Sequence, residues 1–160
     1  MPRLADKVCL LTGAPEALVS RQQAGSLPKA RVMLIDLRAE DLATAAAKLG
    51  ADRIQTVVAD VSRLAEVAEA VGAIVRHWGR IDFLFSNAGN FGVVAPIAAY
   101  PEDMFEAVLA VHVKGASLMC KHATPQMNDG GSVIITSSVV GVRAIPASTV
   151  ISPPSMRRSA

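Results

Sequence analysis

The sequence predicts an α/β domain in which a doubly wound parallel sheet lies between two layers of helices. Two observations support this fold class. Short apolar runs rich in β-branched residues recur along the chain, and longer segments with helical periodicity lie between some of them. Continuous apolar runs are typical of strands that are covered on both faces, as in parallel sheets. Strand–helix–strand units with right-handed crossovers then produce a doubly wound arrangement.

The apolar runs predict five strands, at residues 7–11, 31–36, 54–60, 81–86 and 132–137. One helix is predicted from the apolar residues that recur between Leu64 and Trp78. Ser62 is placed as its N-cap, and Gly79 lies just past its end.

A second helix is predicted to begin at Pro101. Glu102 and Asp103 fall in its first turn, where the helix dipole favours acids. Its predicted apolar stripe consists of Phe105, Val108, Leu109, Ala116 and Met119.

Two stretches do not fit this pattern. The first crossover helix is expected within 15–30, yet that segment has a late Gly25, a Pro28 and a poor apolar stripe. Residues 147–160 are rich in Ser, Pro and Arg, and a disordered tail is their ordinary interpretation. We therefore expect one domain over 1–146, aberrant at 15–30, followed by an aberrant tail.

The composition is that of an ordinary soluble globular protein, with 51% hydrophobic residues and a formal net charge of +2 over 160 residues. It gives no reason to expect a nucleic-acid or membrane partner. No apolar run reaches the length of a membrane span, and residues 1–6 lack the apolar core of a signal peptide, so we expect a cytoplasmic protein. Cys9 and Cys120 lie in apolar segments and are expected to be buried, reduced thiols.

Acidic and small residues follow the predicted strands. Asp36 ends the second strand, where an acid in a dinucleotide-binding unit accepts hydrogen bonds from the adenosine ribose and repels a 2′-phosphate, favouring NAD over NADP. The alternative for Asp36 is a simple turn or cap residue. Asn87, Ala88 and Gly89 directly follow the fourth strand, at the edge where such sheets bind ligands, and small residues there let the backbone approach a cofactor.

Three further pairs occupy equivalent positions after the first, third and fifth strands: Thr12-Gly13, Asp60-Val61 and Ser137-Ser138. The sequence resembles the classical short-chain dehydrogenase/reductase family from about residue 7 to residue 146. The resemblance rests on five motifs that follow the five predicted strands in order: TG, D, DV, NAG and SSVVG. The family has a three-layer, Rossmann-type fold of greater length. The resemblance thus implies that the sheet of this chain is incomplete at its C-terminal end.

The resemblance implies a role for each matched residue. Thr12 and Gly13 would belong to the cofactor-binding turn, and Asp36 would bind the adenosine ribose of NAD. Asp60 and Val61 would contact the adenine.

The remaining matches would act nearer the reaction. Asn87, Ala88 and Gly89 would line the central section of the cofactor. Ser138 would hydrogen-bond the oxygen of a small alcohol or ketone substrate and stabilise charge developing there. No metal is expected. Relatives commonly form homotetramers through the fourth and fifth helices, but this chain lacks the sequence of the fifth.

His112 stands where the family has a structural asparagine on the fourth helix. It also continues the predicted stripe of Phe105, Val108 and Leu109, so one interpretation is a packed, structural histidine. The other is chemical, because its imidazole would hold the helix-backbone water that the asparagine serves in relatives.

The resemblance breaks at two functional motifs. The family's glycine-rich turn reads TGxxxGxG and leads to a helix that binds the pyrophosphate, but here TGAPEALV places Ala17 or Leu18 and Val19 at the later glycines. The family's catalytic Tyr-x-x-x-Lys pair is also absent. Its tyrosine, a general acid/base whose pKa the lysine lowers, is replaced by Ile151, and the lysine by Ser155.

A disrupted reading frame is one explanation of both breaks. Val150–Ala160 has an allowed coding that, read from the third base, gives YIASKHAAVG, which contains the missing Tyr-x-x-x-Lys. The same shift over 15–30 permits AGGIGLATASRLAAEGA. The alternative is a diverged, non-catalytic relative. The coding DNA tests this explanation. If the codons for residues 150–156 encode neither Tyr nor Lys when they are read in the shifted frame, a disrupted frame is excluded.

Three functions remain open. The resemblance implies an enzyme that transfers hydride between NAD and an alcohol/ketone pair. A second possibility is a non-catalytic protein that still binds NAD. The third is a gene product without function, whose fifth strand is poorly covered and exposes apolar surface. The chain as written favours the third.

Overall fold

The computed structural model describes residues 4–13, 29–49 and 53–138. The predictions for the tail at 147–160, for the domain boundary at 146 and for most of the segment 15–30 lie outside these residues. Five strands make up the sheet: β1 (Val8–Thr12), β2 (Arg31–Asp36), β3 (Ile54–Val58), β4 (Ile81–Ser86) and β5 (Met127–Ile135).

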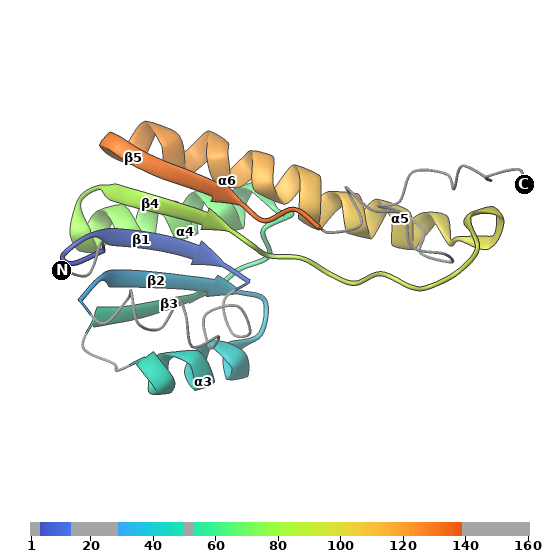
Figure 1. Cartoon of the computed structure of the whole chain (residues 1–160), viewed down its shortest axis with the longest axis horizontal. Coiled ribbons are helices and arrows are strands. Elements are labelled where there is room, and N and C mark those ends of the chain that lie inside the picture. Colours follow the sequence, from blue (N-terminus) through green and yellow to red (C-terminus); the bar gives the residue numbers. More distant parts are fainter. Residues whose placement is uncertain (1–3, 14–28, 50–52, 139–160) are drawn as a thin grey trace, which may run out of the picture.

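The sheet has the order β3-β2-β1-β4-β5, and every adjacent pair is parallel (Figure 1). All five carboxyl ends therefore lie along one edge. This order places β1 at the centre, between two strands that come later in the chain, which is the arrangement of a doubly wound sheet.

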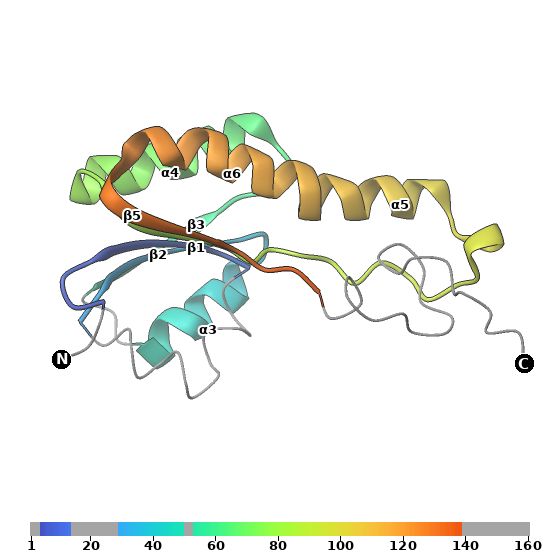
Figure 2. The same cartoon turned by 45° about the horizontal axis from the view of Figure 1, so that its top comes forward.

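Helices cover both faces, which confirms the predicted three-layer α/β class (Figure 2). On one face lies α3 (Ala39–Leu49). On the other lie α4 (Leu64–Trp78) and a long continuous helix made of α5 (Glu102–Leu109), the π-helical segment η3 (Ala110–Gly115) and α6 (Ala116–Ala123). Short 3-10 turns, η2 (Ile97–Ala99) and η4 (Thr124–Gln126), flank this helix.

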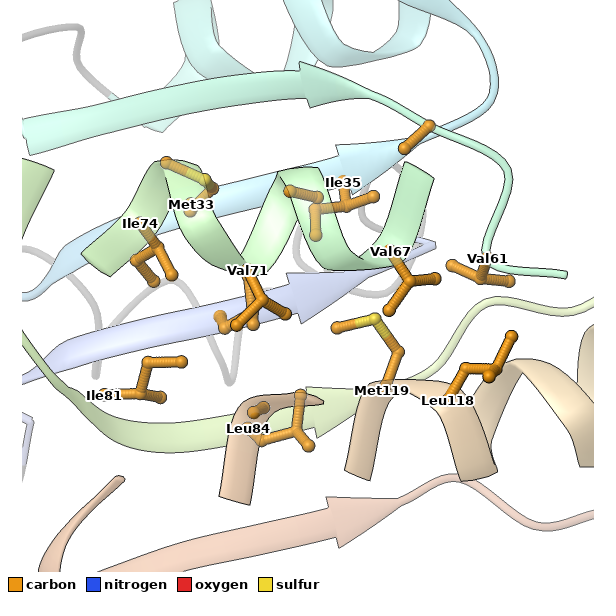
Figure 3. Packing of buried hydrophobic residues seen from close by; sticks show 14 of the residues in the cluster. Met33, Ile35, Val61, Val67, Val71, Ile74, Ile81, Leu84, Leu118 and Met119 are labelled. Atoms are coloured by element: carbon orange, nitrogen blue, oxygen red, sulfur yellow. The ribbon is translucent and has the colours of Figure 1, made fainter. Parts of the chain in front are cut away.

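The larger core lies between the sheet and the helices α4 and α6. Val67 and Val71 of α4 pack with Met119 of α6, which points towards α4 in Figure 3. Leu10 of β1 and Leu84 of β4 form the floor of this core and are fully buried. Their burial fixes which face of each central strand points towards α4.

The smaller core lies under α3 and includes Cys9, Leu34 and Leu42. Burial, together with the negative charge of Asp82, raises the pKa of the Cys9 thiol to about 12. Cys9 is therefore a neutral core residue, as predicted, whereas Cys120 is free but only partly buried.

Two helix predictions need correction. The N-cap of α4 is Arg63, not Ser62, because the hydroxyl and N–H of Ser62 both donate to the Asp60 carboxylate. In the second helix Val108 and Met119 are buried, but Phe105 and Leu109 are 41% and 39% exposed. The reason is geometric, since α5 extends beyond the ends of the strands (Figure 2).

Strand β5 begins earlier than predicted. Met127 pairs with Ile81, the register then shifts, and regular pairing resumes where Ser132 faces Phe83. The predicted poor cover of this strand is confirmed within the described residues, because Ile134 and Ile135 are 47% and 52% exposed. Among all the residues that the structure describes, no helix combines the length and the apolar character needed to span a bilayer.

At the amino-terminal edge of the sheet, Asp82 joins three strands. Its carboxylate accepts hydrogen bonds from the Val8 N–H at 2.9 Å, from Lys7 Nζ at 3.2 Å and from Asn128 Nδ2 at 3.0 Å. Burial alone raises the pKa of Asp82, but these three donors outweigh it and lower the pKa overall. The charged carboxylate therefore stabilises the fold.

We expect Asp82→Asn to lower the free energy of unfolding at pH 7 by about 1–3 kcal/mol, because an amide cannot accept all three hydrogen bonds. A folded-state pKa below the ordinary value gives stability that is complete above roughly pH 4 and lost as the pH falls through the folded pKa. Urea unfolding measured at pH 7 and at lower pH values tests this. The difference in the free energy of unfolding between the unchanged protein and Asp82→Asn should become smaller in acid. Glu69→Gln, which removes an exposed ion pair with Arg76, is the control with little effect. An equal loss in both variants would contradict the role of Asp82.

Candidate functional site at the carboxyl edge of the sheet

The strand register brings the predicted motifs to one edge. Thr12, the last residue of β1, lies opposite Ile35 of β2 and Ser86 of β4. Ser86 in turn lies opposite Ile135 of β5, so the segments that follow these strands start at the same level. Ligands bind at this carboxyl edge in doubly wound sheets, at the point where the strand order reverses.

The buried hydroxyl of Thr12 supports the loop after β4. Its Oγ1 accepts hydrogen bonds from the backbone N–H of Asn87 at 3.0 Å and of Ala88 at 3.1 Å. One side-chain oxygen thus satisfies two successive amides. The predicted residues Thr12, Asn87 and Ala88 do lie together.

Gly13 is held between the same segments. Its backbone has φ +66°, and an added Cβ would lie 2.6 Å from the Ala88 Cα and 2.8 Å from the Ala88 nitrogen. Its N–H donates to Ile35 O at 2.9 Å. Glycine is therefore required here by the approach of the 87–88 backbone as well as by the backbone conformation.

Asn87 joins β1 to the end of β5. Its Nδ2 donates to Gly13 O at 2.9 Å, and its Oδ1 accepts from Thr136 Oγ1 at 2.8 Å. The N–H of Thr136 donates to Ser86 O at 2.9 Å. Both ends of the Asn87 side chain are thus used to fix the edge.

Asp36 is half-buried at the end of β2. Its Oδ1 accepts the Arg38 N–H at 3.0 Å, which is the turn role left open by the sequence. No hydrogen bond to Oδ2 comes from the described part of the chain. The guanidinium of nearby Arg38 pairs with Asp41.

Asp60 is fixed by its own turn. Its Oδ1 accepts from Ser62 N at 2.8 Å and Ser62 Oγ at 2.7 Å, and its Oδ2 lies 3.5 Å from Arg63 Nε. Burial alone raises the pKa of Asp60, but the hydrogen bonds from Ser62 and the charge of Arg63 lower it overall. The Asp60 carboxylate is therefore held ionised at neutral pH.

Val61 follows Asp60 and points into the larger core rather than along the edge. Its Cγ2 lies 2.9 Å from the position that a Cβ on Gly115 would take. Its side chain belongs to the same buried cluster as Leu118 (Figure 3). A contact between Val61 and an adenine would consequently use the backbone.

His112, in the helical segment η3, contacts the loop that follows β4. Its Nε2 lies 3.1 Å from the Asn90 nitrogen and 2.8 Å from the Asn90 oxygen. The ring also lies over Gly89. His112 is therefore a partly buried residue with specific polar contacts, rather than a member of an apolar stripe.

Ser138 is half-buried and lies three residues beyond the carboxyl end of β5. Two contributors to this edge, Asn90 and Thr136, were not predicted. Both are immediate neighbours of predicted motifs, Asn90 after NAG and Thr136 before the serine pair. Their hydrogen bonds cross between elements far apart in sequence, which local patterns do not reveal.

The parallel sheet and its flanking helices are those of a Rossmann-type domain. A family profile described as enoyl-(acyl carrier protein) reductase matches residues 24–153. Levodione reductase of Leifsonia aquatica is 35% identical over 151 residues, covering 89% of this chain. The chain belongs to the short-chain dehydrogenase/reductase family.

Other relatives agree with this assignment. Galactitol 2-dehydrogenase of Agrobacterium fabrum is 33% identical over 145 residues, covering 88% of this chain. Among solved structures, levodione reductase superposes with a TM-score of 0.85 at 30% identity, over 93% of this chain and 60% of that one. NAD+-bound xylitol dehydrogenase superposes with a TM-score of 0.79 at 32% identity, over 91% of this chain and 58% of that one. The chain spans 56% of the length of both curated relatives.

We expect Thr12→Val to lower the free energy of unfolding by about 1–3 kcal/mol, because it keeps the shape of the side chain but leaves two amides without their acceptor. Thr12→Ser, which retains the oxygen, should cost less. Urea unfolding measures the loss, and amide hydrogen exchange at Asn87 and Ala88 locates it. A valine variant as stable as the serine variant would show that the hydroxyl does not hold the loop.

Proposed function

We propose that this chain is the NAD-binding portion of an oxidoreductase that transfers hydride between NAD and a small alcohol or ketone. The observation that carries this proposal is the arrangement of residues at the carboxyl edge of the sheet. Asp36 and the 87–89 loop lie at the carboxyl ends of β2 and β4, on either side of the central strand β1. In a dinucleotide site an acid and a loop at these positions serve the adenosine end and the middle of the cofactor.

At the adenosine end, Asp36 supplies the ribose contact through the carboxylate oxygen that Arg38 N–H does not use. A negative charge at this place accepts from the ribose hydroxyls and repels a 2′-phosphate, which favours NAD over NADP. Asp60, already fixed by Ser62, and the backbone of Val61 lie next along the edge for the adenine.

At the other end, Thr12 and Gly13 position Asn87, Ala88 and Gly89 along the cofactor. Ser138 hydrogen-bonds the substrate oxygen, with His112 on the neighbouring helix. Bound NAD would supply the hydride acceptor. The names of two relatives, a levodione reductase and a galactitol 2-dehydrogenase, support a small alcohol or ketone as the substrate class.

Proton transfer has no donor of the family's kind in this chain. Ile151 and Ser155 stand at the tyrosine and lysine positions, and Tyr100 is the one tyrosine in the sequence. The hydroxyl of Tyr100 lies against Gly92, 2.6 Å from where a Cβ on that glycine would be. We therefore propose that the chain as written binds NAD without turning over a substrate.

We expect Asp36→Asn to weaken NAD binding about tenfold, because a charge-assisted hydrogen bond to the ribose is lost. Binding of NADP should weaken less or improve, since the repulsion of the 2′-phosphate is removed. Isothermal titration with both nucleotides measures the two affinities. Asp129→Asn, an exposed acid near the opposite edge of the sheet, is the matched control. NADP binding tighter than NAD binding in the unchanged protein would refute the proposed preference.

We expect no NADH oxidation above background when the chain is mixed with a panel of ketones. Repair of both aberrant segments, giving TGAAGGIG and the Tyr-x-x-x-Lys pair, should raise turnover well above that background, because a general acid/base contributes about 10²–10⁴-fold. Absorbance of NADH follows the reaction. The control repairs the glycine turn alone, which should strengthen NAD binding without giving turnover. Turnover by the unrepaired chain would disprove the proposed loss of catalysis.

A further inference from the structure

The ring of His112 fills the space that glycine leaves at position 89. A Cβ added to Gly89 would lie 2.6 Å from Cε1 of His112, 3.2 Å from Nε2 and 3.4 Å from Nδ1. The first distance is too short for any side chain at 89 unless the ring moves. Positions 89 and 112, on a loop and a helix, are therefore sterically matched to each other.

One atom of the same ring, Nε2 of His112, contacts the next residue, Asn90. Nε2 lies within hydrogen-bonding distance of both the N–H and the C=O of Asn90, at 3.1 and 2.8 Å. A ring nitrogen either accepts from the N–H or, when it carries a proton, donates to the C=O. Only one of the two backbone groups is paired with His112 at a time, yet either tautomer holds the loop.

A second hydrogen bond joins the same two elements. Asn90 Nδ2 donates to Ala107 O on α5 at 3.2 Å. His112 itself lies in the π-helical segment η3, between α5 and α6. The far end of the loop is therefore held by the helix, while its near end is held by Thr12 and Thr136.

We propose that His112 is a positioning residue for nucleotide binding, which sets the 87–90 backbone by occupying the space over Gly89 and bonding Asn90. The proposal rests on the proposed function, since the loop is the one expected to line NAD. It also assigns Gly89 a different role from close cofactor approach: Gly89 is required by the imidazole ring.

A double-mutant cycle tests the steric part without any nucleotide. Gly89→Ala should reduce the ratio of folded to unfolded protein about tenfold or more when His112 is present, because the methyl group overpacks the site. In a His112→Ala background the same change should cost less than about threefold, since the ring is gone. The control cycle pairs Gly89→Ala with His122→Ala on α6, and there the two losses should add. An equal cost of Gly89→Ala with and without the His112 ring would overturn the proposal.

Amide hydrogen exchange tests the polar part. His112→Ala should remove the protection of the Asn90 N–H, whereas His112→Gln should keep it, because the glutamine amide offers both an acceptor and a donor at a similar reach. Loss of protection in both variants, or in neither, would overturn the hydrogen-bonding role.

Titration with NAD then connects the loop to binding. At a temperature where all variants are folded, His112→Ala should weaken NAD binding by about three- to tenfold and His112→Gln should restore it, whereas a merely structural role would change stability alone. Equal affinities for the unchanged protein and His112→Ala would overturn the positioning role. Absence of NAD binding by the unchanged protein would instead refute the proposed function, and the cycle and the exchange data would still decide whether His112 sets the loop.

Discussion

The register between β1 and β4 is the constraint on which the rest of the site depends. Thr12 reaches two amides of the following loop only because it lies directly opposite Ser86 at the end of the neighbouring strand. A slip of one residue would turn the Thr12 hydroxyl to the other face of the sheet. Burial prevents such a slip, since Leu10 and Leu84 would then leave the core that α4 and α6 cover. Apolar packing in the centre thus determines polar geometry at the edge.

The sequence predicts the centre of this fold better than its margins, for physical reasons. Strands β2 and β4 have the predicted bounds because their apolar runs are enclosed by helices and neighbouring strands. The early start of β5 was missed because NDGG reads locally as a turn, whereas pairing with β4 extends the strand to Met127. Ser62 was misplaced because its hydroxyl bonds back to Asp60, in competition with helix capping. The predicted apolar stripe of the second helix was wrong at Phe105 and Leu109, because periodicity shows which residues share a helix face but not whether the sheet extends beneath it.

The candidate site was predictable as a set of motifs but not as a set of contacts. TG, D, DV and NAG indicate positions after successive strands, and the parallel topology brings those positions together. Asn90 and Thr136 were not predicted because their partners, His112 and Asn87, come from distant elements. For the same reason Gly13 and Gly89 were first interpreted through a cofactor. In the fold, backbone and ring atoms of the protein itself fill the space beside both glycines.

The carboxyl edge of the sheet is held together by residues from elements that lie far apart in the sequence. Thr12 ends β1, the 87–90 loop follows β4, Thr136 follows β5, and His112 comes from the helical segment between α5 and α6. The hydrogen bonds among Thr12, Asn87 and Gly13 hold this edge, although Ile134 and Ile135 of the neighbouring strand β5 are exposed. The function proposed for this edge also involves the sequence after β1, in which the later glycines of the family's motif are substituted. Under the proposed function, these substitutions would affect binding of the phosphates more than the adenosine contacts proposed for Asp36 and Asp60, because the two aspartates lie on β2 and after β3 rather than in the turn.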